Sequence, residues 1–127
     1  MTLDVGGAFL NADMPDTGPK VHVRIDGPAA QILADMDPTH KAHLDERGTI
    51  IVQLRKALYG TVQASKLWYQ TLSLKLSELG YQKNAYDPCV FNKTVEGHQV
   101  TIALHVDDMF VTSVNREDLD EIGRAHV

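Results

Sequence analysis

The sequence is poor in cysteine and has no long apolar runs. Cys89 is the single cysteine among 127 residues, so an internal disulfide and a cysteine-based zinc site are both excluded. We expect Cys89 to be a small core residue in a reducing compartment. Apolar stretches such as 102–106 are too short to cross a bilayer, and no signal peptide opens the chain. We therefore expect an intracellular protein without membrane segments.

Positive charge is also scarce. Lys and Arg number 12 against 17 Asp and Glu, which gives a net charge of −5. Because backbone binding to nucleic acid needs clustered Lys and Arg, this balance excludes a simple nucleic-acid clamp. A metal-dependent polymerase centre is itself acidic, and the surfaces that hold a duplex can lie in other parts of a larger protein. A polymerase function would therefore require further segments.

The apolar periodicity predicts an α+β fold, with an antiparallel sheet and helices packed on one of its faces. The helix expected over 64–79 carries an apolar stripe of Trp68, Leu72, Leu76 and Leu79, broadened by Leu67 and Leu74, and Gly80 ends it. Strands are expected at 3–7, 21–25, 49–54, from 90 onward, 100–106 and 109–111, with shorter helical segments at 8–11, 29–35 and 37–44. No second domain is visible.

Two adjacent acids interrupt the last pair of strands. Asp107 and Asp108 are expected at the bend of a β-hairpin, where Asn-Gly or Asp-Gly is usual. Adjacent carboxylates repel unless a cation or protons offset their charge. Asp4 adds a carboxylate within an apolar strand, where burial would be costly without a partner. Together they form the minimum set for two-metal phosphoryl transfer, although an isolated Asp-Asp pair is more often two solvated turn acids.

Four segments resemble, in order and spacing, motifs of copia-type retrotransposon reverse transcriptases, which are RNA-directed DNA polymerases. They are DVGGAFLN at 4–11, KALYGTVQASKLWY at 56–69, DPCVF at 87–91 and HVDDM at 105–109. The resemblance covers essentially residues 2–115. His105 replaces the usual tyrosine of the "YVDD" motif, so any role of that hydroxyl is in doubt. Val62, Ser65 and Lys66 replace the usual Lys, Pro and Arg.

The resemblance implies a metal centre. Asp4, Asp107 and Asp108 fall at the catalytic metal-carboxylate positions, with Asp4 and Asp107 the more direct ligands and the Val5 carbonyl an additional one. Two Mg²⁺ ions are implied, and Mn²⁺ is an accepted substitute. One ion would lower the pKa of the primer 3′-hydroxyl, and the other would orient the triphosphate and stabilise the pyrophosphate.

The resemblance also implies a nucleotide pocket. Phe9 falls at the aromatic position that packs under the incoming sugar and excludes a 2′-hydroxyl, although alone it would be interpreted as a core aromatic. Tyr59, Gly60 and Gln63 fall at nucleotide-binding positions, with Gln63 the weakest of them. Trp68 and its neighbour Tyr69 are interpreted as helix-core residues.

The implied fold is a partial polymerase palm spanning 1–121 of a Gag-Pol polyprotein. Residues 122–127 correspond to a common sequencing adapter translated in frame, so we interpret them as an artefact; the alternative is a natural helix end. The fingers would precede Met1, and the thumb and ribonuclease H would follow Glu121. The implied partners of the intact protein are an RNA or DNA template with primer and deoxynucleoside triphosphates, within a cytoplasmic virus-like particle. This chain alone is not expected to polymerise.

Two alternatives stay open at this stage. The first is a transposon relic without selected function, which predicts stop codons or frameshifts in the flanking DNA. The second is a small non-catalytic interaction domain that reuses the palm sheet, and it predicts indifference to loss of Asp107.

Overall fold

The computed structural model describes residues 1–124, and the chain divides into two compact units. Unit 1 consists of Met1–Asp13 together with the chain from Lys56 onward, and unit 2 is Met14–Arg55. The sequence showed no second domain, so this division is a new finding. It follows from where apolar side chains gather, because unit 2 has a small core of its own.

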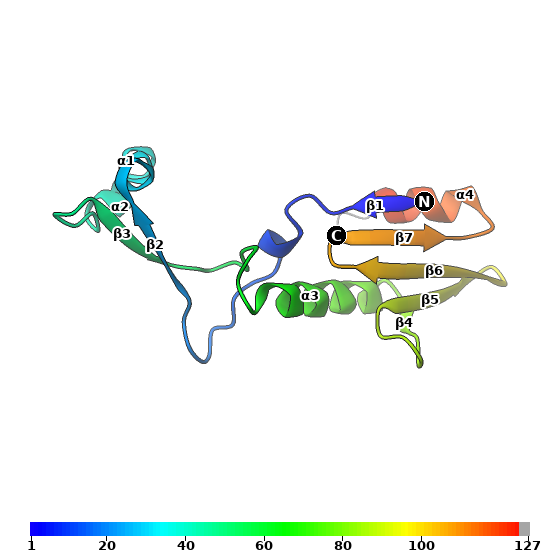
Figure 1. Ribbon diagram of the computed structural model, residues 1–127. Coiled ribbons are helices and arrows are strands. Elements are labelled where there is room, and N and C mark those ends of the chain that lie inside the picture. The colour runs from blue at the N-terminus through cyan, green and yellow to red at the C-terminus, as the bar shows by residue number, and fades with distance from the viewer. Residues whose placement is uncertain (125–127) are drawn as a thin grey trace. The chain divides into compact units, whose positions relative to one another are not determined.

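Unit 1 is built on a five-stranded sheet with the order β1-β7-β6-β5-β4, in which every neighbouring pair is antiparallel (Figure 1). The strands are β1 (Thr2–Asp4), β4 (Gln82–Lys83), β5 (Val90–Val95), β6 (His98–His105) and β7 (Asp108–Thr112). Strand β1 therefore forms one edge of the sheet, beside the β6–β7 hairpin.

Two helices, α3 (Ala64–Glu78) and α4 (Arg116–Arg124), cover one face of this sheet. Leu76 of α3 and Ile122 of α4 line the same small pocket as Ile102 and Met109 of the sheet. Because Ile102 and Met109 lie on one face, both helices pack there, which confirms the predicted α+β arrangement.

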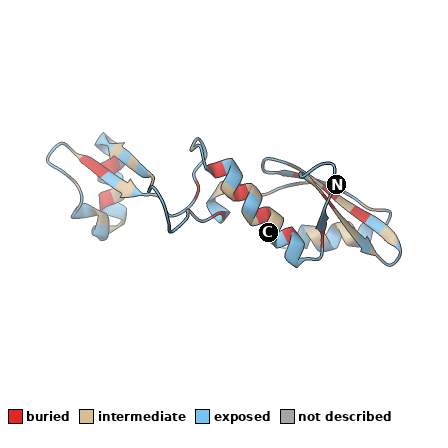
Figure 2. Ribbon diagram, turned by 90° about the horizontal axis from the view of Figure 1, so that it is seen from below, coloured by how far each residue is buried: buried red, intermediate tan, exposed pale blue. Residues whose placement is uncertain are grey.

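The apolar stripe of α3 is confirmed in part. Trp68, Leu72 and Leu76 are each 1% exposed, and buried positions recur along the helix (Figure 2). The prediction that Leu74 belongs to the stripe is wrong, because its side chain is 63% exposed. Leu79 is 37% exposed and lies at the rim of the stripe. Gly80 has a φ of 86°, the left-handed conformation that commonly ends a helix.

The opposite face of the sheet carries no helix of unit 1 among the described residues. Along β7, Met109 and Val111 are buried while Asp108, Phe110 and Thr112 are exposed, which is the period of a strand with one covered face. Asp4 and Asp108 therefore lie on the open face, and Asp107 lies in the turn at its end.

Unit 2 consists of two short strands and two short helices. Strand β2 (His22–Asp26) pairs antiparallel with β3 (Thr49–Gln53), and α1 (Gly27–Met36) and α2 (Pro38–Lys41) lie between them in the chain. Its core consists of Ala30, Ala34 and Ile50, against which Ile25, Leu33, Leu44 and Val52 pack.

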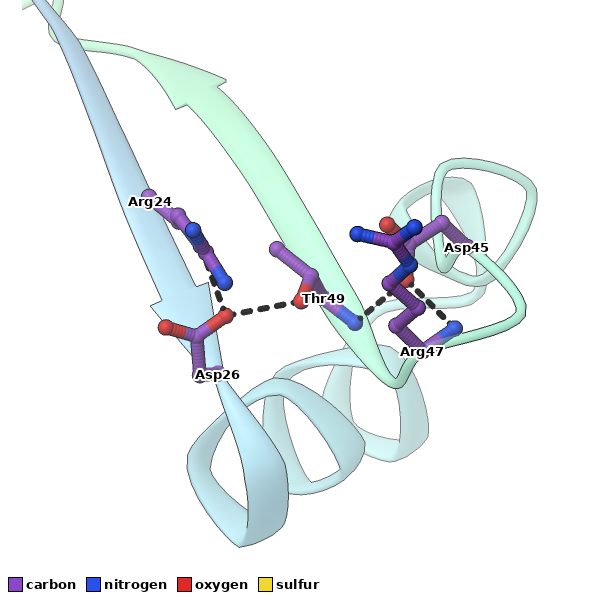
Figure 3. Close-up of polar contacts among 5 residues, drawn as sticks. All are labelled: Arg24, Asp26, Asp45, Arg47 and Thr49. Atoms are coloured by element: carbon purple, nitrogen blue, oxygen red, sulfur yellow. Dashed lines mark hydrogen bonds and ion pairs between the residues drawn. The ribbon is translucent and has the colours of Figure 1, made fainter.

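Polar contacts fix the end of the β2–β3 pair (Figure 3). The Asp26 carboxylate accepts hydrogen bonds from the Thr49 hydroxyl at 2.7 Å and from the Arg24 Nε at 2.9 Å. These bonds hold the pKa of Asp26 below its usual value. Asp45 accepts the backbone N–H groups of Thr49 and Arg47 at 2.8 and 2.9 Å, so the loop before β3 is closed on the strand.

Several of the remaining elements match the predictions, but the strand expected at 3–7 ends at Asp4, and β4 and α4 were not predicted. The 3₁₀ helix η1 occupies Ala8–Asn11, and Asp37 caps α2 through the Thr39 N–H at 2.9 Å. Cys89 was wrongly expected in the core; it is exposed, because it lies in the turn before β5.

Within residues 1–124, no helix is long and apolar enough to cross a membrane. Residues 122–124 continue α4, whereas the rest of the segment interpreted as adapter-derived, 125–127, lies outside the described residues.

Candidate functional site

The acid pair lies at the tight turn between β6 and β7. His105 pairs with Asp108, which leaves Val106 and Asp107 as a two-residue loop. The predicted bend is therefore confirmed, with one difference: Asp107 is in the loop, and Asp108 is the first residue of β7. Val106 has a φ of 57°, a left-handed conformation that is a genuine outlier for a β-branched residue.

The strand-borne acid lies opposite this hairpin, which the resemblance implied but the residues alone could not show. Asp4 is the register partner of Asp108 in the antiparallel pairing of β1 with β7. The next residue extends the contact, since the Val5 N–H donates to the Asp107 carbonyl at 3.3 Å. Segments more than 100 positions apart in the sequence are thus brought together at the edge of the sheet.

The expected reason for the importance of Asp4 was wrong. Asp4 is exposed, not buried, because β1 is an edge strand and Asp4 lies on the open face. Asp107 and Asp108 are exposed as well. Burial therefore does not force these carboxylates to find a partner.

The donor set fits a divalent cation in chemistry and backbone placement. Carboxylates and carbonyls are the ligands that Mg²⁺ prefers. In the described part of the chain, none of the three carboxylates takes part in a side-chain hydrogen bond or an ion pair, so all are available. Their side chains do not converge, however, since residues 1–124 contain no group of three His, Cys, Asp or Glu placed to hold a metal. Like charges at such positions are expected to stay apart until a cation offsets them.

The Val5 carbonyl already has one partner. It accepts the Ala8 N–H at 3.0 Å, which starts the turn into η1. A carbonyl oxygen has two lone pairs, so this bond leaves one acceptor position for a further ligand.

The helix residues Trp68 and Tyr69 do more than fill the core. The Trp68 indole N–H donates to the Val106 carbonyl at 2.8 Å. The Tyr69 hydroxyl donates to the Pro88 carbonyl at 2.7 Å. Sequence reasoning placed both in the helix core and missed these bonds, although two adjacent residues that each carry a polar tip were the available signal.

The Asp87–Phe91 segment also contacts the β6–β7 hairpin, through strand β6. Asp87 accepts the Cys89 N–H through its carboxylate at 2.8 Å, which closes the turn before β5. The Cys89 carbonyl in turn accepts the Leu104 N–H at 2.8 Å. The turn is therefore joined to the last part of β6, immediately before the acid pair.

Two of the predicted nucleotide-pocket residues contact each other. The rings of Phe9 and Tyr59 have centroids 5.6 Å apart and a tilt of 33°. Tyr59 is 81% exposed, and Gly60 has a φ of 90°, which explains the glycine in this turn. Gln63 is exposed and precedes α3 without a side-chain cap bond. An aromatic surface thus lies on η1 and on the turn that leads into α3.

Residues 1–125 match the family model described as reverse transcriptase (RNA-dependent DNA polymerase). Over 114 residues the chain is 32% identical to the Ty1-MR1 transposon Gag-Pol polyprotein of Saccharomyces cerevisiae, covering 89% of this chain and 5% of the polyprotein. It is 29% identical over 115 residues to the retrovirus-related Pol polyprotein from transposon TNT 1-94 of Nicotiana tabacum, covering 90% and 8%. The chain thus spans less than a tenth of these relatives. No solved structure matches it.

Proposed function

Since this chain belongs to the reverse transcriptase (RNA-dependent DNA polymerase) family and matches the Gag-Pol polyproteins of copia-type retrotransposons, we propose that it supplies the metal-binding palm centre of such a polymerase. The observation that carries the proposal is the register of β1 against β7, which sets Asp4 opposite Asp108 and Val5 beside Asp107. Members of the family act on nucleic acid, and we infer the particular reaction from the residues of this site.

We propose Asp4 and Asp107 as the more direct ligands of two Mg²⁺ ions, with Asp108 and the Val5 carbonyl completing the set; Mn²⁺ would substitute. Bound at these oxygens, the ions would supply acidification of the primer 3′-hydroxyl and charge stabilisation on the triphosphate. The carboxylates themselves hold charge and position and transfer no group. Their exposure on the open face leaves room for primer and nucleotide.

The aromatic pair supports the nucleotide part of the proposal. Phe9 is half-buried and its ring contacts that of Tyr59, so an aromatic edge would be available to the sugar. A rigid ring at that position would reject a 2′-hydroxyl by contact, which selects deoxynucleotides. Gly60 lets the chain turn sharply next to Tyr59, and Gln63 would add an amide at the same border.

The template and primer would be RNA or DNA, held by segments of the polyprotein outside this chain. The net charge of −5 fits this division, because a carboxylate centre needs basic surfaces supplied elsewhere to hold phosphates. For the parent element we propose reverse transcription inside a cytoplasmic virus-like particle.

Calorimetric titration of the full chain with Mn²⁺ tests the metal centre. Mn²⁺ takes the same oxygen ligands as Mg²⁺. We expect Asp107→Asn to weaken Mn²⁺ binding by at least about tenfold, which is about 1.4 kcal/mol. Asp16→Asn is the matched control, because it makes the same charge change at an exposed acid of unit 2.

Equal affinities of wild type, Asp107→Asn and Asp4→Asn would contradict the proposal. That result would favour a non-catalytic role for the sheet, since such a role is indifferent to these carboxylates.

A further inference from the structure

One buried side chain from α3 donates a hydrogen bond to the left-handed turn that carries Asp107. Val106 is 50% exposed and has a φ of 57°, so its own side chain gains little from packing while its backbone is strained. A non-glycine residue in this region is unfavourable and persists only where its surroundings impose it. Something outside the two-residue loop must therefore hold it.

Beside the β6–β7 pairing, the Trp68 indole makes such a contact from outside the sheet. It is 1% exposed, packed on the covered face of the sheet, and its N–H reaches the Val106 carbonyl at 2.8 Å. The bond joins residues 38 positions apart, between a long helix and the loop. Since a buried indole N–H without an acceptor is costly, the bond fixes the direction of that carbonyl and, with it, the plane of the Val106–Asp107 peptide. The pairing of His105 with Asp108 holds the peptide before Val106, so both planes that flank its Cα are held, and its φ is held with them.

We propose that Trp68 is a positioning residue for the metal carboxylates: its indole N–H holds the Val106 carbonyl, and this keeps the β6–β7 turn in the left-handed conformation that presents Asp107 beside Val5. The metal-positioning part of this inference rests on the proposed function. The structural part, the holding of the turn, stands on the contact alone.

The geometry separates this role from ordinary core packing. Leu72 and Leu76 are as buried on the same stripe of α3, yet neither has a polar group that could direct the turn. Replacement of Trp68 by Phe keeps an aromatic ring and removes the N–H. The turn would then be free to leave the left-handed region, because relaxation of Val106 is favourable by itself.

The first test measures the turn without metal. NMR couplings of the full chain should give a positive φ for Val106 in the wild type and a negative φ in Trp68→Phe. The wild-type indole N–H should exchange with solvent on the order of a hundredfold more slowly than a free indole. Leu76→Val is the control for packing, and it should leave Val106 φ positive.

The second test is rescue. Glycine adopts positive φ readily, so Val106→Gly should keep the turn left-handed even without the indole bond. We expect Trp68→Phe to weaken Mn²⁺ binding about tenfold, and the double variant Trp68→Phe with Val106→Gly to recover binding to within about threefold of wild type.

The outcomes distinguish the two proposals. A positive Val106 φ and unchanged Mn²⁺ affinity in Trp68→Phe would overturn the positioning role and leave the metal centre standing. A second outcome is that the turn relaxes in Trp68→Phe while the wild type binds no Mn²⁺ at Asp107. This would support the role of Trp68 in holding the turn and would overturn the metal chemistry. Failure of Val106→Gly to rescue would overturn the account of strain.

Discussion

The two hairpins that share strand β6 make their two-residue turns in different ways. Between β5 and β6, Glu96 and Gly97 have φ values of 48° and 84°, which matches the turn type that suits the twist of paired strands. Between β6 and β7, the left-handed position is occupied by Val106, followed by Asp107. The first turn has a glycine at one of its two left-handed positions, whereas the second has a β-branched residue at its left-handed position.

The two ends of β6 are also tied to the helices differently. His98, which follows the first turn, contacts the Asp118 carboxylate of α4 at 2.7 Å. Val106, in the second turn, accepts the neutral indole N–H of Trp68 from α3. The acid-bearing turn therefore depends on a distant contact without a titratable group, whereas the other turn contains a glycine and is followed by a hydrogen bond to a carboxylate.

Removal of the Trp68 side chain should have the largest effect on this comparison. Trp68→Ala deletes a buried aromatic and the hold on the second turn, so we expect a loss of about 3–5 kcal/mol in unfolding free energy. Urea denaturation measures it. Leu74→Ala on the exposed side of α3 should change stability by less than about 0.5 kcal/mol. Similar losses in both variants would contradict the central place of Trp68.

Gly97→Val places a valine at a left-handed position of the first turn, where no helix side chain bonds the loop itself. A Cβ at Gly97 meets nothing within 4 Å, so the cost is the backbone strain at a φ of 84°. We expect a loss of about 1–3 kcal/mol in unfolding free energy, measured by urea denaturation. A cost below about 0.5 kcal/mol would show that a valine is tolerated in such a turn and would weaken the contrast.

Val106→Gly is the reverse change, and we expect it to stabilise the chain by about 1 kcal/mol. The removal of left-handed strain is worth about 1–3 kcal/mol, and the greater chain entropy of unfolded glycine offsets about 0.5–1 kcal/mol of it. A rise in the urea midpoint at an unchanged slope would confirm it. A lower midpoint would mean that Val106 contributes packing that outweighs its strain.

Acid should weaken the contact between His98 and Asp118, beside the first turn, at a pH where the bond from Trp68 to Val106 persists. Hydrogen bonds from Ser113 and His98 hold the pKa of Asp118 below its usual value of 3.8. A lowered carboxylate pKa gives stability that is present above the unfolded value and is lost as pH falls through the folded value. We therefore expect the contribution of Asp118 to be lost below about pH 4.

Stability measured against pH in Asp118→Asn checks this, because the variant should lack that part of the acid loss. Asp120→Asn, in the same helix, is the control. If Asp118→Asn loses as much stability in acid as the wild type does, the contact between His98 and Asp118 does not contribute as expected. The Trp68 indole N–H should stay protected from exchange through the same pH range.

The sequence predicted what depends on local periodicity. The α3 stripe, the alternation along β6 and β7, the helical turn at Ala8–Asn11 and the turn at Gly60 were each expected from spacing and residue type. The facing of Asp4 and the hairpin acids was expected as well, because four motifs in order implied it. Each of these features can be predicted from residues that are close in the sequence or from a known motif.

The features that escaped prediction depend on distant partners. The bond from Trp68 to Val106 joins segments 38 residues apart, and the polar tip of Trp68 signals a partner without identifying it. The exposure of Asp4 follows from the edge position of β1, and the exposure of Cys89 from its place in a turn. The separation of Met14–Arg55 depends on which apolar residues pack together, and periodicity does not reveal that.

Paramagnetic broadening by Mn²⁺, recorded on the isotopically labelled full chain, tests the central claim most directly. Substoichiometric Mn²⁺ should broaden the backbone signals of Asp4, Val5, Asp107 and Asp108 first, together with the indole N–H of the single tryptophan, Trp68. Broadening centred instead on the acidic first turn of α4, at Glu117 and Asp118, would contradict a metal centre at the β6–β7 turn.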